Sequence, residues 1–278
     1  MSNVPPDIED IRIEHPERWC LDLSVNTQQL QFILYAPEQS ESLVMRSIAL
    51  DKGVPALQAL ENAVYDHPWL LGDYRRVRVV TYSPHFLVLP TPVAGDDTLV
   101  ARSLAEAYPA DDGERATCTL PQCGVSIAYL LPQGTMGFLQ RTFNNPPVVH
   151  HLYPLCEHFK SLNQGSRIAR MFVNLQPGRM DMAVYRQGEF ILANSLAMRN
   201  TADATYLLLH TWQSMGLDAL TDEIQLTGDK SQRDELAPEL RRFVKYVMPA
   251  IFPASALRLG QDAMQAPLDL ILLATCES

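Results

Sequence analysis

LDLSVNTQQLQFILY (residues 21–35) and VNLQPGRMDMAVY (residues 173–185) are the two stretches that decide the fold of this 278-residue chain. In each, apolar and polar residues alternate on both sides of a polar tip, which is NTQQ in the first and QPGR in the second. Alternation with a period of two is typical of strands with one buried face, and a short polar tip between two such runs is typical of a turn. Each stretch therefore predicts a β-hairpin.

The two hairpins align with each other. Asp22 aligns with Asn174 at an offset of 152 residues, and Tyr35 aligns with Tyr185 at an offset of 150. This alignment predicts a turn that is two residues shorter in the second copy. Self-similarity along a chain indicates a repeated structural unit, so we expect a duplicated unit.

The elements that follow each hairpin repeat as well. A third strand, an amphipathic helix and a further strand are predicted for residues 42–50, 54–70 and 76–84 in the first copy and for residues 189–198, 201–217 and 222–230 in the second. The intervening residues 95–165 alternate between short helix and strand patterns. We expect an α/β protein of two lobes, residues 1–165 and 166–278, each a mixed sheet with a three-strand meander flanked by helices.

Composition and charge exclude several classes of function. The chain has 47% hydrophobic residues and a net charge of -10, which disfavours a nucleic-acid partner. No run approaches the ~20 apolar residues of a membrane span, and the charged, proline-containing N-terminus does not resemble a signal peptide. The five cysteines have irregular spacings, which favours reduced thiols. We expect a cytoplasmic protein without a membrane span.

Three short motifs carry a resemblance to a known fold, namely LDLS (21–24), VNLQPG (173–178) and LTGDKS (226–231). With the duplicated order of elements, they resemble the actin, sugar kinase and heat-shock chaperone ATPases, whose lobes have a ribonuclease-H-like fold. Among the branches of this fold, the pattern resembles the pilus-assembly and cell-division branch. It resembles even more closely an uncharacterised bacterial family of unknown function, known mainly from Bacteroidetes, that has the same fold. The resemblance implies a cleft between the lobes that binds ATP and Mg²⁺.

The resemblance also places seven candidate cofactor-binding residues in that cleft: Asp22, Ser24, Asn174, Gln176, Gly178, Gly228 and Asp229. Ser24, Gln176 and Asp229 stand where the resembled family has glycine. Glycine lets backbone N–H groups approach a phosphate closely, so side chains there block the approach. Asn174 stands where a second carboxylate is expected, and the amide removes negative charge that Mg²⁺ needs.

Several of these residues also have purely structural interpretations. Asp22 is either a residual group that positions Mg²⁺ or water, or a strand residue hydrogen-bonded to the neighbouring hairpin or to Ser24. The sequence QPG at 176–178 is sufficient for a turn, with glycine supplying the positive φ. Ser231 is predicted to cap a helix beginning at Gln232, although a helix N-terminus is also an anion site.

Other polar and aromatic residues carry weaker signals. His150, His151, Cys156 and His158 lie close in sequence, but their spacing does not match a zinc site, and we expect core or surface side chains. Trp69 is either a buried staple between the lobes or an exposed anchor for a partner. The apolar residues 266–278 are expected to form a last helix packed on the second lobe, with a docking helix as the alternative.

The altered phosphate motifs favour a non-catalytic scaffold or adaptor that acts through a protein partner, with weak or absent nucleotide binding. The alternative is an actin-like protein that binds or hydrolyses ATP with Mg²⁺, in which Asp22 holds the metal or the attacking water. A small-molecule kinase is a third class. It would need a polar, acidic sugar-binding insertion, and residues 95–165 contain none that is convincing.

Overall fold

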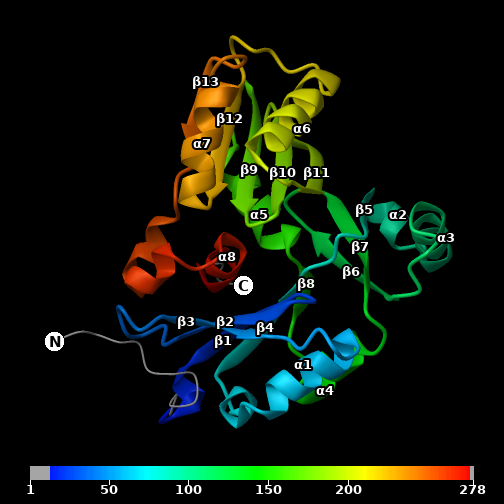
Figure 1. The fold of residues 1–278 in the computed structure, drawn as a ribbon, viewed down its shortest axis with the longest axis vertical. Coiled ribbons are helices and arrows are strands. Elements are labelled where there is room, and N and C mark those ends of the chain that lie inside the picture. The colour runs from blue at the N-terminus through cyan, green and yellow to red at the C-terminus, as the bar shows by residue number, and fades with distance from the viewer. Residues whose placement is uncertain (1–12, 276–278) are drawn as a thin grey trace.

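The computed structural model describes residues 13–275, which form two five-stranded sheets and one three-stranded sheet covered by helices (Figure 1). The first sheet contains, in spatial order, β3 (Val44–Ala49), β2 (Gln29–Tyr35), β1 (Cys20–Val25), β4 (Arg76–Thr81) and β8 (Val148–His150). The second contains β11 (Glu189–Ala197), β10 (Arg179–Arg186), β9 (Ala169–Gln176), β12 (Glu223–Gly228) and β13 (Tyr246–Pro249). The third contains β5 (Phe86–Pro90), β7 (Val125–Leu131) and β6 (Glu114–Leu120).

The two five-stranded sheets have the same topology. Each starts with an antiparallel meander of three strands, and two strands parallel to the first are then added. The helices are α1 (Ala56–Tyr65), α2 (Thr91–Ala94), α3 (Asp97–Ala107), α4 (Thr135–Thr142), α5 (Leu152–Leu162), α6 (Thr201–Ser214), α7 (Lys230–Leu240) and α8 (Leu268–Thr275), with short 3₁₀ turns η2 (Pro16–Arg18), η3 (Pro68–Leu71), η4 (Ala254–Leu259) and η5 (Gln261–Met264). The predicted order of strand, strand, strand, helix and strand is present in both lobes. Within residues 13–275, no helix is long and apolar enough to cross a membrane.

Successive side chains of β2 point to opposite faces of the first sheet. Leu30, Phe32 and Leu34 are buried in the core that the first sheet forms with α1 and α4. Ile33 and Tyr35 point to the opposite face, which faces the second lobe, and pack there against the C-terminal segment. Apolar residues on both faces explain why the end of β2 is buried throughout, as expected for a sheet covered on both sides.

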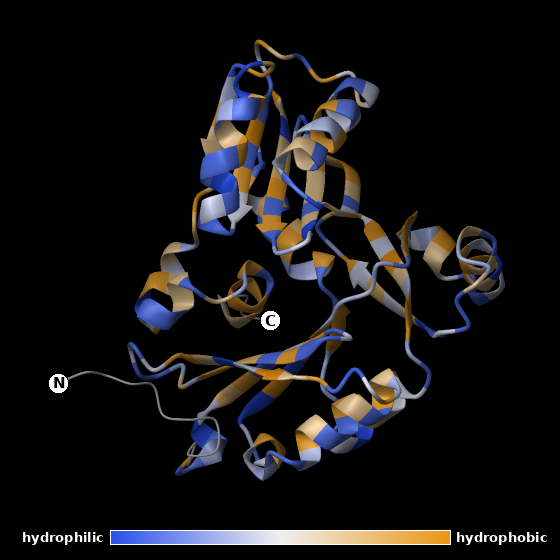
Figure 2. Ribbon diagram, in the orientation of Figure 1, coloured by the Kyte–Doolittle hydropathy of each residue, from blue (hydrophilic) through white to orange (hydrophobic). Residues whose placement is uncertain are grey.

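The C-terminal helix lies between the two lobes (Figure 1). Leu270 and Ile271 pack with Ile33 of the first sheet, whereas Leu272 belongs to a cluster that contains Phe172 of the second sheet. Hydrophobic residues dominate α8 (Figure 2), as its contacts on several sides require. The helix was expected at this point of the chain, but it packs between both lobes rather than on the second lobe alone.

Trp69 packs inside the first lobe. Its ring lies 4.7 Å from that of Phe32, centroid to centroid, and the half-buried side chain packs against the core on the α1 side of the first sheet. It is therefore neither a staple between the lobes nor an exposed anchor, and its position serves the packing of the η3 turn.

Candidate functional site

A cavity of about 650 Å³ lies between the lobes. Its walls come from β2 and β3 of the first sheet, the end of β9, the junction of β12 with α7, and the segment that leads into α8. Four of the seven candidate residues line it, namely Asn174, Gln176, Gly228 and Asp229. The other three, Asp22, Ser24 and Gly178, lie outside its lining.

Asp22 is fully buried and bound to an arginine. Arg78 Nε and Nη2 donate to its two carboxylate oxygens at 2.8 and 2.7 Å. The two residues are direct neighbours on β1 and β4. Burial raises the pKa of Asp22. Burial also lowers the pKa of Arg78, but the hydrogen bonds and attraction to Asp22 outweigh this effect, so the pKa of the guanidinium is raised. A bidentate pair of this kind is strong when both groups are charged, so the carboxylate is held by Arg78 rather than by the hairpin or Ser24.

Strand pairing changes the alignment of the two hairpins. Ser24 pairs with Gln31 as Asn174 pairs with Asp181, and in each pair the partners are seven positions apart. The offset between the hairpins is therefore 150 residues throughout, and their turns have equal length. Ser24, which is buried, is the counterpart of Asn174, and Asp22 is not.

Local packing accounts for Gly228 and Asp229. Gly228 has a φ of 87° at the end of β12, and a Cβ there would lie 2.7 Å from Leu175 N and closer still to Leu175 O. Only glycine tolerates this approach of two strands. Asp229 is the N-cap of α7, and its carboxylate accepts a hydrogen bond from Gln232 N at 2.9 Å. The cap is thus Asp229 rather than the predicted Ser231.

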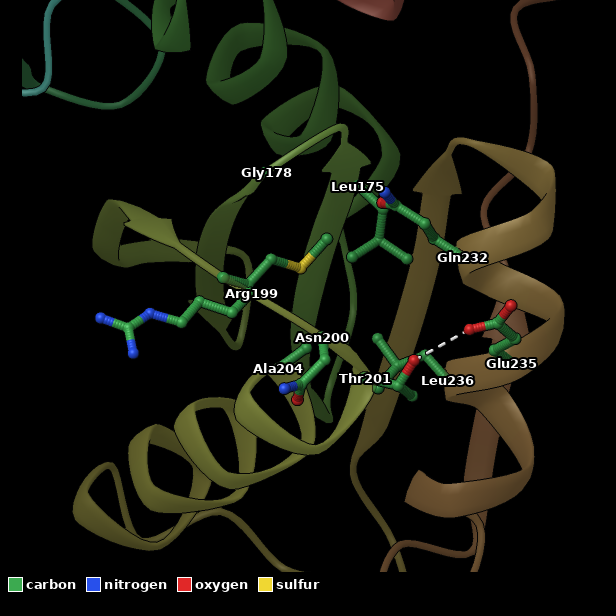
Figure 3. A pocket seen from close by; sticks show the side chains of 10 residues that line it. Leu175, Gly178, Arg199, Asn200, Thr201, Ala204, Gln232, Glu235 and Leu236 are labelled. Carbon is green, nitrogen blue, oxygen red and sulfur yellow. Dashed lines mark hydrogen bonds between the residues drawn. The ribbon is translucent and has the colours of Figure 1, made fainter.

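Gly178 lies in the turn between β9 and β10, directly after Pro177, with a φ of 77° and open space around its Cβ position. It lines a smaller cavity of about 230 Å³ between the start of α6 and one side of α7 (Figure 3). Thr201 Oγ1 donates to Glu235 Oε2 at 3.0 Å across this cavity (Figure 3). The glycine therefore serves the turn and does not face the interlobe cavity.

A buried polar cluster around Asp181 lies next to the interlobe cavity, and the sequence did not single it out. Asp181 accepts hydrogen bonds from Ser195 Oγ at 2.7 Å, His151 Nε2 at 3.2 Å and Asn174 Nδ2 at 3.3 Å, and Arg179 Nε lies 3.5 Å away. Burial alone would raise the pKa of Asp181, but attraction to His151 and these hydrogen bonds hold it well below its usual range. A carboxylate within the apolar pattern of residues 180–185 is the sequence signal that could have indicated it.

Helix α8 brings a second buried carboxyl group to this region. Asp269 is 2% exposed, and its Oδ1 has no hydrogen-bond partner in the part of the chain that the structure describes. Burial raises the pKa of Asp269, while the charges of Arg179 and His151 oppose the rise. Asp269 and Asp181 thus have pKa values displaced in opposite directions, which gives the interface between α8 and the second sheet one low and one high carboxyl pKa.

The fold's stability is expected to fall as the pH drops below about 6.5, because His150 is buried as a neutral ring. Its Nε2 donates to Ser83 O at 3.0 Å, Leu152 N lies 3.4 Å from Nδ1, and burial followed by repulsion from His151 sets its pKa well below the usual value. The unfolded chain binds a proton in this range and the folded chain does not, so the free energy of unfolding should fall by up to about 1.4 kcal/mol per pH unit.

Urea titrations between pH 7.5 and 5.5 measure this fall. His150→Phe keeps the contacts with Phe86 and Tyr129 but cannot titrate. The slope of the free energy of unfolding against pH should be smaller in this variant, and equal slopes in the two proteins would contradict the prediction.

The residues around the cavity do not fit Mg²⁺. Among residues 13–275, Asp229 is the single carboxylate in its lining, and one of its oxygens caps α7. In residues 13–275, no group of three or more His, Cys, Asp or Glu side chains is placed to hold a metal ion. Mg²⁺ requires oxygen ligands, carboxylates above all, and here Asn174 and Gln176 replace them with amides.

Two solved structures are similar to the chain over nearly its whole length. One is the crystal structure of a Bacteroides thetaiotaomicron protein with an actin-like ATPase fold and unknown function, which has a TM-score of 0.76 and 22% identity and covers 94% of this chain and 97% of that chain. The other is a PilM–PilN type IV pilus biogenesis complex, with a TM-score of 0.55, 13% identity, and coverage of 93% of this chain and 99% of that chain. These likenesses establish the actin-like fold of two lobes.

Among curated proteins, none matches the chain. Residues 9–247 match the family model described as "Protein of unknown function (DUF3822)". Because this match spans most of the sequence, the chain belongs to the DUF3822 family.

Proposed function

We propose that this protein is a non-catalytic scaffold or adaptor with the actin-like fold, which acts in the cytoplasm through a protein partner and binds nucleotide weakly or not at all. The bidentate pairing of Asp22 with Arg78 carries the proposal. A carboxylate with both oxygens bound to arginine is not free to ligate a metal or orient a water. Releasing it would break a buried ion pair, at a cost of about 3–5 kcal/mol.

Two further points support a role in protein contacts. The described residues of the cavity lining supply one carboxylate, Asp229, where a metal-dependent ATPase needs several. A fold neighbour is described as part of the PilM–PilN complex, so this fold occurs in at least one protein assembly. The second candidate is an ATP-binding protein, which is favoured by the cavity's size and by Lys230 and Arg233 in its lining.

Titration calorimetry with ATP and ADP, with and without Mg²⁺, distinguishes the two candidates. We expect no saturable heat up to millimolar nucleotide and no phosphate release above the rate without protein. Arg233→Ala, which alters a half-buried side chain of the cavity, should leave both traces unchanged. Micromolar, Mg²⁺-dependent binding that is lost in this variant would replace the scaffold with the ATP-binding candidate.

A further inference from the structure

Helix α8 couples the two lobes, because it packs on both of them (Figure 1). Towards the first lobe, Ile271 lies in one cluster with Tyr35, whose hydroxyl donates to Ala274 O at 3.3 Å. Towards the second lobe, Leu272 lies in the cluster that contains Phe172. Whatever controls the docking of α8 therefore controls how the lobes are held together.

Asp269 is the single charged residue of α8, and it is buried. Its Oδ1 has no hydrogen-bond partner among residues 13–275, so this oxygen lacks a donor that would support a negative charge. The ionisable groups that act on it belong to the second lobe: Arg179 and Asp181 on β10, and His151 at the start of α5. Asp181 binds both of the others, His151 Nε2 at 3.2 Å and Arg179 Nε at 3.5 Å.

The other acidic and basic side chains on elements packed against α8 are bound elsewhere or face water. They are Asp22, Arg76 and Arg78 on the first sheet, Glu157, His158 and Lys160 on α5, and Arg258 on η4. Those of the first sheet and α5 have hydrogen-bond partners other than Asp269, and Arg258 is exposed. Arg179, Asp181 and His151 therefore form the electrostatic surroundings of Asp269.

This cluster is electrically neutral when it holds one proton besides those of Arg179. The guanidinium keeps its positive charge, the two carboxylates each carry a negative one, and His151 is charged only when protonated. Hydrogen bonds and attraction to His151 hold the pKa of Asp181 well below its usual range, so the proton does not reside there. Burial raises the pKa of Asp269, which keeps a proton at pH values where an exposed aspartate has lost it.

Loss of this proton leaves one uncompensated negative charge in a buried place, which is costly unless the charge reaches water. Asp269 can reach water if α8 leaves its position. Residues 250–267 join α8 to β13 and contain only the short turns η4 and η5, and no described strand follows β13. The helix can therefore leave without breaking the strand pairing of either lobe.

We propose that α8 is a proton-sensitive clamp between the lobes, which holds while the cluster around Asp269 keeps this proton and is released when rising pH removes it. The carboxyl of docked α8 has a raised pKa and that of released α8 an ordinary one, so the docked state binds more protons. Release is then favoured by up to tenfold per pH unit until docked Asp269 has ionised. The clamp goes beyond the scaffold function and does not depend on it.

Hydrogen–deuterium exchange of the full chain between pH 5 and 9 tests the clamp. Protection factors correct for the effect of pH on the intrinsic exchange rate. Those of the α8 amides should fall by about tenfold or more as the pH rises. In Asp269→Asn they should not depend on pH, because a neutral amide leaves Arg179 and Asp181 balanced. The matched control is Glu157→Gln, which removes another buried carboxyl of raised pKa, one bound to Gln122 N, and should keep the dependence of the unmodified protein.

The thiol of Cys20 gives a second readout, since it is buried in the cluster that contains Ile271 of α8. At pH 9, alkylation of Cys20 by iodoacetamide, located by mass spectrometry, should be faster in the unmodified protein than in Asp269→Asn. Protonation of His150 affects both proteins and is removed by comparing them. Circular dichroism establishes that the variants fold, and Asp269→Ala replaces Asp269→Asn if the amide does not.

Two results would overturn the clamp. One is α8 protection that stays constant with pH in the unmodified protein. The other is protection that falls as steeply in Asp269→Asn as in the unmodified protein, because another group would then be responsible.

Discussion

Replacing Asp22 with alanine is expected to lower the free energy of unfolding by about 3–5 kcal/mol. The carboxylate is 0% exposed and is the bidentate partner of Arg78, so its removal breaks a buried ion pair and both of its hydrogen bonds. The hydroxyl of Tyr35, 3.2 Å from Arg78 Nη2, offers no negative charge in compensation, because burial raises the pKa of this tyrosine. Urea unfolding followed by tryptophan fluorescence measures the change.

A matched control separates this buried pair from ion pairing in general. Arg102 and Glu106 form a pair at 2.8 Å on α3, with side chains 75% and 67% exposed. Glu106→Ala should change the free energy of unfolding by less than about 0.5 kcal/mol, because water screens the pair. A loss in Asp22→Ala no larger than in this control would show that Asp22 is not held by Arg78, and would return it to the candidates for metal binding.

The hairpins and the order of elements were predictable because they depend on local pattern. The apolar residues of 29–35 and 179–185 alternate with the period of a strand, and the turn at Pro177 and Gly178 has residues suited to its backbone angles. Neither prediction depends on knowing which strands become neighbours. This is also why the two lobes were recognised without any knowledge of how they pack.

The partners of the candidate residues were not predictable in the same way. Arg78 lies 56 positions after Asp22, and only the parallel pairing of β4 with β1 brings the two together. The alignment of Asp22 with Asn174 failed for a related reason. It matched residue types in two short motifs, whereas cross-strand pairing, which sequence comparison does not contain, makes Ser24 the counterpart.

The polar cluster between the lobes shows the same limit. Asp181, His151 and Asp269 lie on β10, at the start of α5 and on α8, and three separate packing contacts bring these elements together. His151 had been interpreted as a core or surface side chain. Its burial fits that interpretation, but its bond to Asp181 depends on tertiary structure. The carboxylate of Asp181 within an apolar strand was a signal that the sequence offered, whereas only the position of α8 gives Asp269 its environment.

Gly228→Ala is expected to lower the free energy of unfolding by about 3 kcal/mol or more. The residue needs a φ of 87°, which disfavours any side chain, and its Cβ would meet the backbone of Leu175 on the neighbouring strand, which is fixed by the pairing of β12 with β9. A flexible side chain can move aside, but a backbone carbonyl within a sheet cannot. Urea unfolding of the purified variant measures the loss.

Gly178→Ala is the control, because Gly178 has a similar φ of 77° but no described residue within 4 Å of its Cβ position. This variant should lower the free energy of unfolding only by the cost of placing a side chain at positive φ, about 1–2 kcal/mol. The difference between the two variants therefore isolates the strand contact at Leu175. Equal losses would mean that β12 and β9 separate readily at this end, which would allow a side chain at Gly228 and weaken the structural explanation for the glycine. A clearly larger loss at Gly228 would assign this glycine to sheet packing, without any need for a nucleotide beside it.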